Sequence, residues 1–312
     1  LAVFVKATAA FFVGVPFLWL VFSGGILKGL RNKRLYLMAA LALVPAIAFT
    51  LWNAIWEGNA GAIFGSRLFT SLYLQPHWYQ SWFMNAKSMV GYFPLFLGVL
   101  AIFLFHDKRK RAWYVSLWVA YLLLGIVFSY HIYTHDYYSM PLIPIVSIGF
   151  GLFFSLVIDR IHLENPAWLA RVLVLGVLAF ACALSILKAR TEMLAANYQY
   201  EITYWKALGN RLGRNSKVIA LTHDYGYRLE YWGYLKPTLW QTSGDITVSN
   251  LSGQQQTPFL QEFDSRTEGQ DFFLVTLIND FNSQNQLHDY LFAHYPVEEG
   301  EGYLIFDLQH PN

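Results

Sequence analysis

The segment from Ser129 to Tyr138 holds the side chains of this sequence with the clearest capacity for chemistry. It reads Ser-Tyr-His-Ile-Tyr-Thr-His-Asp-Tyr-Tyr. In a helix, His131 and His135 would lie one turn apart on one face, a spacing that can hold a divalent metal with Asp136 nearby. No glutamate follows the first histidine and the sequence shows no third ligand, so a metal is the weaker interpretation.

Two other interpretations of this segment stay open. Its four tyrosines could form an aromatic belt at a membrane surface, with both histidines in water. Alternatively, His135 and Asp136, together with Tyr137 and Tyr138, could contact a polar or phosphorylated headgroup. Composition alone favours neither of these two.

A longer segment, residues 57–88, supplies the cationic candidates Arg67, His77 and Lys87. A basic side chain over a phosphate is favourable because neutralisation in a partly dry site is worth more than in bulk water. The aromatic and leucine side chains of this segment could let it lie in a membrane interface as amphipathic helices. The simpler alternative is that Arg67 and Lys87 only reach out to lipid phosphates.

Both segments are polar islands in a chain that is otherwise unusually apolar. Of the 312 residues, 55% are hydrophobic and 13% are charged, against about 25% charged residues in a typical soluble domain. This composition therefore disfavours a simple soluble globule. The basic residues stand in tight clusters between long apolar runs, which indicates membrane topology and not a nucleic-acid partner.

The elements that must position the candidate residues are membrane spans. A span needs about 20 residues to cross the hydrocarbon. The expected fold class is a polytopic α-helical membrane protein with about six spans over residues 1–187. The expected spans are 7–26, 35–56, 89–105, 112–130, 139–158 and 172–187, the last being short.

Lysine and arginine counts in the connections predict the orientation, because cytoplasmic loops carry the excess of these residues. The basic residues of the first, third and fifth connections are Lys28, Arg31, Lys33 and Arg34, then Lys108 to Arg111, then Arg160 and Arg171. The second connection holds only Arg67 and Lys87, and the fourth holds none. The odd connections are thus expected in the cytoplasm, and the tail outside it, unless the short last stretch fails to cross.

The tail, residues 188–312, is expected to be a small soluble extracytoplasmic α/β domain. It carries 9 Lys and Arg against 15 Asp and Glu, whereas residues 1–187 carry 13 against 5. A helix is predicted over 198–212 and another over 283–294, with strands at 218–221, 272–277 and 303–308 in a parallel or mixed sheet. Residues 241–258 are expected to be a loop. His223 and Asp224 follow a strand where α/β sheets often bind ligands, although this sequence also suits a turn.

The run His-Asp-Tyr-Tyr-Ser-Met-Pro-Leu-Ile-Pro, residues 135–144, resembles the late outside loop and helix of GT-C membrane glycosyltransferases that use polyprenyl-phosphate sugars. This superfamily includes protein O-mannosyltransferases and the lipid A aminoarabinose transferase. The segment 222–234, Thr-His-Asp-Tyr-Gly-Tyr-Arg followed after two residues by Tyr-Trp-Gly-Tyr, is similar to the soluble domain that ends bacterial members. The resemblance covers the order of spans, outside loops and terminal domain.

The resemblance implies transfer of a sugar from a polyprenyl-phosphate donor to a protein, lipid or glycan acceptor, with inversion, at the plasma (inner) membrane. Such a site needs a carboxylate that takes the acceptor proton and cationic or hydrogen-bonding groups for the leaving phosphate. The family's essential acidic residue lies in a first outside loop that has no match here. The catalytic residue is therefore unassigned, and we expect the chain to be the C-terminal portion of a longer enzyme.

Two other classes of function remain as alternatives. One is a polytopic binding or assembly protein whose tail recognises a partner without chemistry. The other is a transporter, which the near absence of ionisable residues in the expected spans makes the weaker alternative.

Overall fold

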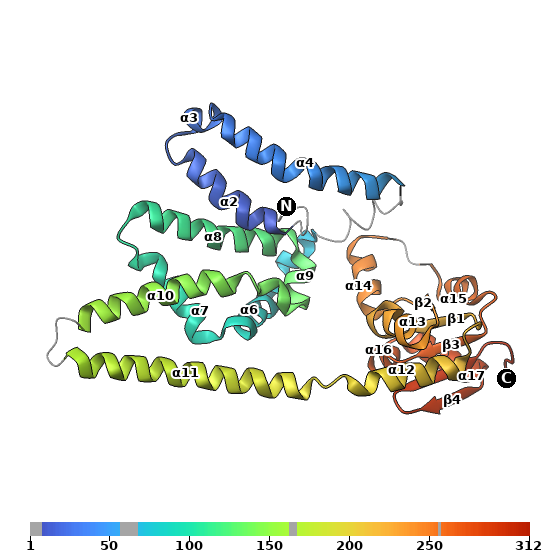
Figure 1. Cartoon of the computed structure of the whole chain (residues 1–312). Coiled ribbons are helices and arrows are strands. Elements are labelled where there is room, and N and C mark those ends of the chain that lie inside the picture. Colours follow the sequence, from blue (N-terminus) through green and yellow to red (C-terminus); the bar gives the residue numbers. More distant parts are fainter. Residues whose placement is uncertain (1–7, 57–67, 162–166, 255–256) are drawn as a thin grey trace. The chain divides into compact units, whose positions relative to one another are not determined.

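The computed structural model describes residues 8–56, 68–161, 167–254 and 257–312 (Figure 1). The chain divides into two compact units, Leu1–Val177 and Leu178–Asn312. The boundary falls inside one helix, ten residues before the boundary expected from the sequence.

The first unit is helical throughout its described residues. Two helices, α7 and α10, pack side by side, as do α2 and α8. Its elements are α2 (Ala9–Phe22), α3 (Ile26–Leu30), α4 (Lys33–Trp56), η1 (Thr70–Leu74), α6 (Pro76–Val90), α7 (Tyr92–Leu104), α8 (Lys108–Val127), α9 (Ser129–Thr134), η2 (Asp136–Ser139) and α10 (Leu142–Ile161). The helix α11 (Ala167–Ala195) begins in this unit and ends in the second.

Within the described residues, four helical segments are long and apolar enough to cross a membrane, which is fewer than the six expected spans. They are α4, α8, α10 and the segment that begins at Trp168 and contains α11. The expected span 89–105 is the 13-residue α7, which qualifies only jointly with α6, and these two helices meet at an angle of 99°. The expected span 7–26 is the 14-residue α2. The chain thus has several long apolar helices, as the membrane class requires.

The last expected span is longer in the structure than its apolar stretch. Residues 172–187 lie within α11, which has 29 residues and extends in both directions. A helix of this length covers about 43 Å. The short apolar run is therefore no obstacle to a crossing.

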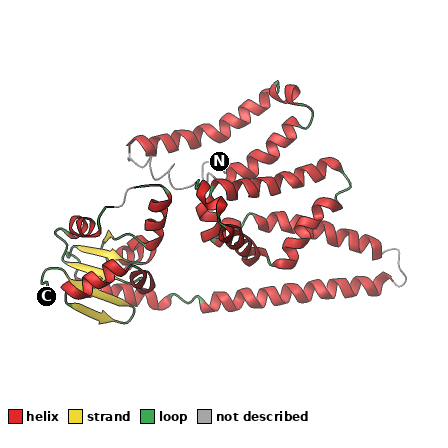
Figure 2. Ribbon diagram, turned by 180° about the vertical axis from the view of Figure 1, so that it is seen from behind, coloured by secondary structure: helices red, strands yellow, loops and turns green. Residues whose placement is uncertain are grey.

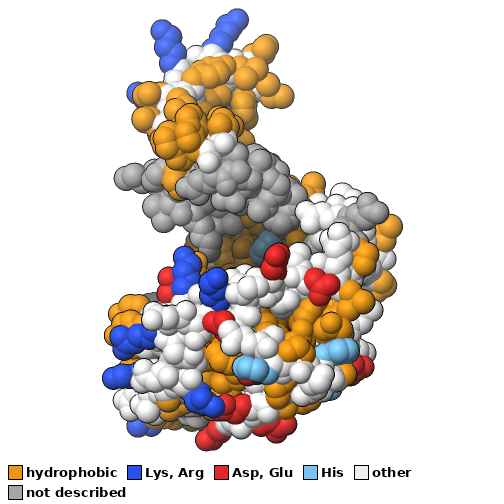
Figure 3. Space-filling view, turned by 90° about the vertical axis from the view of Figure 1, so that its right-hand side faces the viewer, with side chains coloured by type: hydrophobic (Ala, Val, Ile, Leu, Met, Phe, Trp, Pro, Cys, Tyr) orange, Lys and Arg blue, Asp and Glu red, His pale blue; other side chains and the backbone are white. Residues whose placement is uncertain are grey.

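Charged residues mark the helix ends in the first unit. Asp107 caps α8, and its carboxylate accepts hydrogen bonds from the backbone N–H groups of Arg109 (2.7 Å) and Lys110 (3.3 Å). These two bonds hold the pKa of Asp107 below its ordinary value. Figure 3 shows hydrophobic side chains over the uppermost part of the first unit, where α3 and α4 lie, with lysine and arginine at its top. The basic clusters therefore stand at the ends of apolar helices, as the orientation argument assumes.

Glycines allow α7 and α10 to approach closely. A Cβ on Gly149 would lie 2.9 Å from the Cα of Gly98. The hydroxyl of Tyr114 lies at the same crossing, 2.8 Å from the Gly98 carbonyl and 3.0 Å from that of Ile145. Small residues and interhelical hydrogen bonds are the usual means of packing helices in lipid.

The second unit contains a five-stranded sheet with helices around it (Figure 2). The strand order is β2-β1-β3-β5-β4. The strands β2, β1 and β3 pair in parallel, and β5 is antiparallel to both of its neighbours, β3 and β4. Its elements after α11 are α12 (Gln199–Leu212), β1 (Val218–Leu221), η3 (His223–Gly226), α13 (Tyr227–Gly233), β2 (Thr238–Leu239), α14 (Ser243–Leu251), α15 (Phe259–Thr267), β3 (Phe272–Val275), α16 (Ile278–Ser283), α17 (Asn285–His294), β4 (Val297–Gly300) and β5 (Tyr303–Asp307).

The central strands are buried on both faces. Alternate residues of a strand point to opposite faces. Ile219 and Phe273 join one apolar cluster with α15, α16 and α17, whereas Ala220 and Leu274 join another with α12 and α13. Such continuous apolar strands are typical of a sheet covered by helices on both sides.

The expectations for the tail are confirmed for its main elements. The helices at 198–212 and 283–294 and the three predicted strands are present within a few residues, in a mixed sheet. The expected loop over 241–258 is wrong for residues 243–251, which form α14. Thr242 and Asp245 form a capping box there, with each side chain bonded to the backbone of the other. This Thr-x-x-Asp pattern can be recognised in the sequence.

Candidate functional site

The polar segments of the first unit are joined at one buried serine. Ser129 begins α9 and is fully buried. Its hydroxyl accepts a hydrogen bond from the backbone N–H of Phe69 (2.7 Å), and its carbonyl accepts one from the Trp78 indole (2.6 Å). These bonds fix η1 and α6 against α9.

Asn85 joins α6 to the other end of α9. Its amide donates to the carbonyls of Ile132 (3.1 Å) and Tyr133 (2.9 Å). The last carbonyls of a helix have no partner within it, so this side chain satisfies groups that the short α9 leaves free. The two helices also meet where the rings of His77 and Tyr133 contact edge-on, with centroids 5.4 Å apart. Of the cationic candidates, His77 is thus brought next to the segment 129–138.

The histidines and tyrosines of α9 and η2 form one cluster of rings. The rings of His131 and His135 stack with centroids 6.0 Å apart. His131 contacts Tyr138 at 5.3 Å, and His135 contacts Tyr137 at 5.2 Å. The helical spacing assumed from the sequence is present, because the backbone N–H of His135 still donates to the carbonyl of His131 (2.9 Å). We call these four residues the histidine–tyrosine cluster.

The ligands for a metal ion do not converge on this cluster. In the described parts of the chain, no group of three His, Cys, Asp or Glu could hold an ion, whereas structural zinc sites take four ligands and catalytic sites three. Asp136 is exposed, and Nδ1 of His135 lies 2.7 Å from the Thr134 hydroxyl. The cluster therefore offers imidazole and phenol groups, and Asp136 beside it a carboxylate, for hydrogen bonding to a polar ligand.

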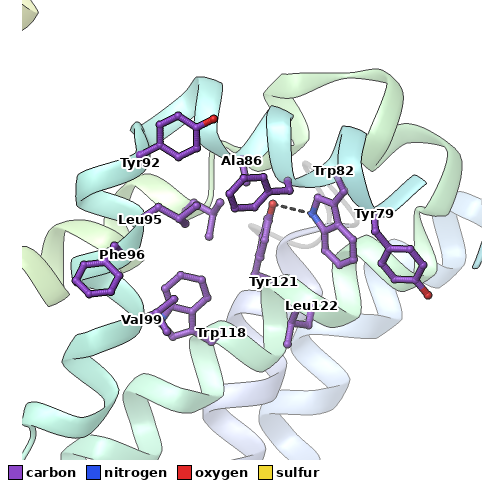
Figure 4. A pocket seen from close by; sticks show the side chains of 12 residues that line it. Tyr79, Trp82, Ala86, Tyr92, Leu95, Phe96, Val99, Trp118, Tyr121 and Leu122 are labelled. Carbon is purple, nitrogen blue, oxygen red and sulfur yellow. Dashed lines mark hydrogen bonds between the residues drawn. The ribbon is translucent and has the colours of Figure 1, made fainter. Parts of the chain in front are cut away.

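An apolar groove lies beside this region, between α6, α7 and α8 (Figure 4). Its volume is about 600 Å³, within the usual range for ligand pockets. Aromatic and aliphatic side chains line it. They are Tyr79, Trp82, Phe83, Ala86, Tyr92, Leu95, Phe96, Val99, Trp118, Tyr121, Leu122 and Leu142.

Two polar groups in the groove wall are engaged with the protein. The Trp82 indole donates to the Tyr121 hydroxyl (2.8 Å), which lies 2.9 Å from the hydroxyl of the fully buried Ser139 (Figure 4). The Trp82 ring lies against Gly125 of α8, where a Cβ would come within 2.1 Å of it. The groove therefore has an apolar surface at this point, and hydrogen bonds within the protein hold the side chains that form it.

Lys87 stands at the edge of the groove. Its ammonium lies 5.0 Å from the centroid of the Tyr92 ring, which lines the groove. Lys87 and His77 are ten residues apart on α6, or about 15 Å along its axis. The structure therefore places these two candidates at different ends of α6, and Arg67 lies outside the described residues.

The groove itself was not expected from the sequence. Trp118, Tyr121 and Leu122 lie in one expected span, where they look like ordinary apolar residues. Which of them face a groove depends on the sharp turn between α6 and α7, at Gly91 with its positive φ of 80°. Gly-Tyr-Phe-Pro at residues 91–94 is the signal that could have indicated a break there.

No family model, curated protein or solved structure matches this chain. Function is therefore inferred from three features of the first unit, which are the groove, Lys87 at its edge and the histidine–tyrosine cluster.

Proposed function

We propose that this protein is an integral membrane glycosyltransferase of the GT-C type, with six spans and an extracytoplasmic tail, that binds a polyprenyl-phosphate sugar. The observation that carries the proposal is an apolar groove of about 600 Å³ with a lysine at its edge. A polyprenyl phosphate has the matching chemistry, since a long apolar chain ends in an anion. The acceptor would be a protein, lipid or glycan outside the cytoplasm.

The expected orientation puts the groove in the outer half of the membrane. The groove is lined by the first half of α7, from Tyr92 to Val99, and by the second half of α8, from Trp118 to Leu122. The basic cluster 108–111 lies between these helices at their other ends, and such clusters stay in the cytoplasm. A carrier chain in the groove would therefore lie in the outer leaflet, with its phosphate at the outer surface.

Lys87 is the cation best placed for that phosphate. It is half-buried and fixed over Tyr92, so its charge interacts in a medium less polar than water. An ordinary lipid phosphate could contact Lys87 equally well. The proposed role differs from simple contact with a lipid phosphate because the groove would also bind the polyprenyl chain.

The histidine–tyrosine cluster is proposed to contact the sugar or the acceptor. In the transfer, the bond between the anomeric carbon and the phosphate oxygen breaks as the acceptor oxygen bonds to that carbon. The acceptor proton passes to a carboxylate, and the polyprenyl phosphate leaves as an anion. We assign no residue of this chain as that base, because Asp136 does not occupy the position of the family's catalytic acid.

The test is sugar transfer by membranes that contain the protein expressed from its complete gene. We expect the wild-type protein to turn over a radiolabelled polyprenyl-phosphate sugar. The rate should fall in the Lys87→Ala variant and in the Val99→Trp variant, whose new side chain fills the groove. The matched controls are Lys110→Ala in the opposite basic cluster and Leu175→Trp on the exposed side of α11. Full turnover with both groove variants would contradict the proposal.

The same assay separates the alternative functions. A protein that binds the carrier saturably but transfers no sugar to any acceptor fraction would be a binding or assembly protein. Release of the carrier on the opposite side of a sealed vesicle would indicate a transporter.

A further inference from the structure

We infer that the second unit docks on the membrane surface through a rim of four exposed tyrosines, Tyr198, Tyr200, Tyr225 and Tyr227. The occupant of this face is the headgroup layer of the bilayer that α11 enters. The inference requires α11 to cross the membrane but is independent of sugar transfer. We call these four residues the tyrosine rim.

The rim lies on one edge of the sheet. Tyr198 and Tyr200 flank the start of α12, while Tyr225 and Tyr227 follow the carboxyl end of β1. An ion pair between Glu201 of α12 and Arg228 of α13 joins the two segments. The beginnings of both helices and the end of β1 therefore form one continuous edge.

All four rings are largely exposed. Between 61% and 68% of the surface of each residue is accessible. Among the described residues, no ring stacking or side-chain hydrogen bond involves any of them. By contrast, Tyr234, also exposed, carries the Arg214 guanidinium over its ring at 4.9 Å. The rim thus presents amphipathic rings that nothing in the described chain covers.

The backbone that carries one of these rings is strained. Asp224 and Tyr225 have positive φ angles of 49° and 54°. Residues other than glycine rarely adopt this left-handed conformation, and strain of this kind gathers at functional positions. In this conformation 64% of the surface of Tyr225 is accessible.

The connection is long enough to let this edge reach the membrane. From Leu187, where the apolar stretch ends, α11 continues for eight residues, about 12 Å. Headgroups occupy roughly 5 to 7 Å on each side of the hydrocarbon. If α11 runs perpendicular to the membrane, Ala195 lies about 5 to 7 Å beyond the headgroups. Only three residues then separate Ala195 from α12, and they reach about 10 Å when extended. A chain that turns back after Ala195 therefore lets the start of α12 rest among the headgroups.

Tyrosine is the side chain expected at this depth. Its ring is apolar and its hydroxyl hydrogen-bonds, so tyrosine and tryptophan are enriched at both membrane interfaces. Charge does not drive the docking, because Arg228 is paired with Glu201 and Asp224 and the tail as a whole is acidic. Uncharged lipid should therefore be sufficient, and added salt should have little effect.

The test is fluorescence quenching with the whole chain in phosphatidylcholine nanodiscs, some of whose lipids carry a spin label on the headgroup. Single cysteines replace Tyr200 or Tyr227 in a Cys182→Ser background and are labelled with a fluorophore. The controls are Asn215→Cys and Glu268→Cys, which precede β1 and β3 at the opposite edge, about 20 Å away by the length of α12. We expect loss of fluorescence at 200 and 227 and none at 215 and 268.

Equal quenching at both edges, or stronger quenching at 215 and 268, would overturn the docking. A label on the native Cys182, quenched by spin-labelled acyl chains, checks separately that α11 is in the bilayer. If Cys182 is quenched and the rim is not, the docking is wrong and the span is right. If Cys182 is not quenched, both are wrong.

A second measurement tests the tyrosines themselves. With the reporter on Tyr198→Cys, the pair Tyr200→Asn and Tyr227→Asn should lower the headgroup quenching. The matched control Tyr234→Asn removes an equally exposed tyrosine from the far end of α13 and should leave the quenching unchanged. Unchanged quenching in the rim variant would contradict the role of these rings.

Discussion

Gly125→Ala should disturb the groove through a single methyl group. A Cβ at this position would lie 2.1 to 2.8 Å from three atoms of the Trp82 ring, so the ring must move. Overpacking of this kind costs about 1 to 3 kcal/mol, and loss of the Trp82–Tyr121 hydrogen bond adds about 0.5 to 1.5 kcal/mol. Replacing glycine within a helix returns about 1 kcal/mol. We therefore expect a net loss of about 0.5 to 3.5 kcal/mol in the free energy of unfolding.

The assay is reversible unfolding in mixed micelles, monitored by tryptophan fluorescence. Gly151→Ala in α10 is the matched control, because a Cβ there meets nothing within 4 Å and the helix alone should gain up to about 1 kcal/mol. Gly125→Ala should also weaken binding of a polyprenyl phosphate, since Trp82 lines the groove. If Gly125→Ala is as stable as Gly151→Ala and binds the carrier equally well, the described packing of α6 on α8 is wrong.

Two further predictions concern the second unit. Gly209→Ala should separate α12 from α13, because the new Cβ would lie 2.1 Å from the Gly233 carbonyl oxygen. We expect the free energy of unfolding to fall by about 3 kcal/mol, seen as faster hydrogen exchange in β1. Exchange at the wild-type rate would refute this prediction. Burial, and after it the charge of Arg228, lowers the pKa of His223 in the folded state. The folded state therefore favours the neutral ring. As the pH falls below about 6.5, the ordinary pKa of histidine, the unfolded state takes up a proton that the folded state resists, and the free energy of unfolding falls. Unfolding at pH 8 and pH 5 should show a steeper loss for the wild type than for His223→Asn, and equal slopes would contradict the burial of this ring.

The sequence predicted the tail better than the membrane part. Val218–Leu221 and Tyr303–Asp307 are short apolar runs between polar turns, and their strand character is local. Two strands were missed because their sequences show no clear alternation of apolar and polar residues. The strand β2 has only two residues, Thr238 and Leu239, and β4 reads Val-Glu-Glu-Gly. In the membrane part, apolar length alone did not show that α2 is short or that α7 follows α6 at a sharp angle.

The candidate site was predictable in part. The rings of His131 and His135 stack as i, i+4 neighbours on a helix can, although α9 ends at Thr134 and His135 is its extended C-cap. The contact of His77 with Tyr133 depends on how α6 packs against α9, which is set by Asn85 and Ser129 far along the chain. Such pairings between distant segments leave no periodic signal, and the groove is invisible in the sequence for the same reason.

The most direct test of the proposed carrier site is a cross-linking map with a polyprenyl phosphate that bears a photoreactive group in its chain. We expect cross-links on α6, α7 and α8 at residues of the groove. Unlabelled polyprenyl phosphate should compete with the probe, and polyprenol, which lacks the phosphate, should compete much less. Cross-links spread over the exposed faces of α4 and α11, without competition, would contradict the carrier site.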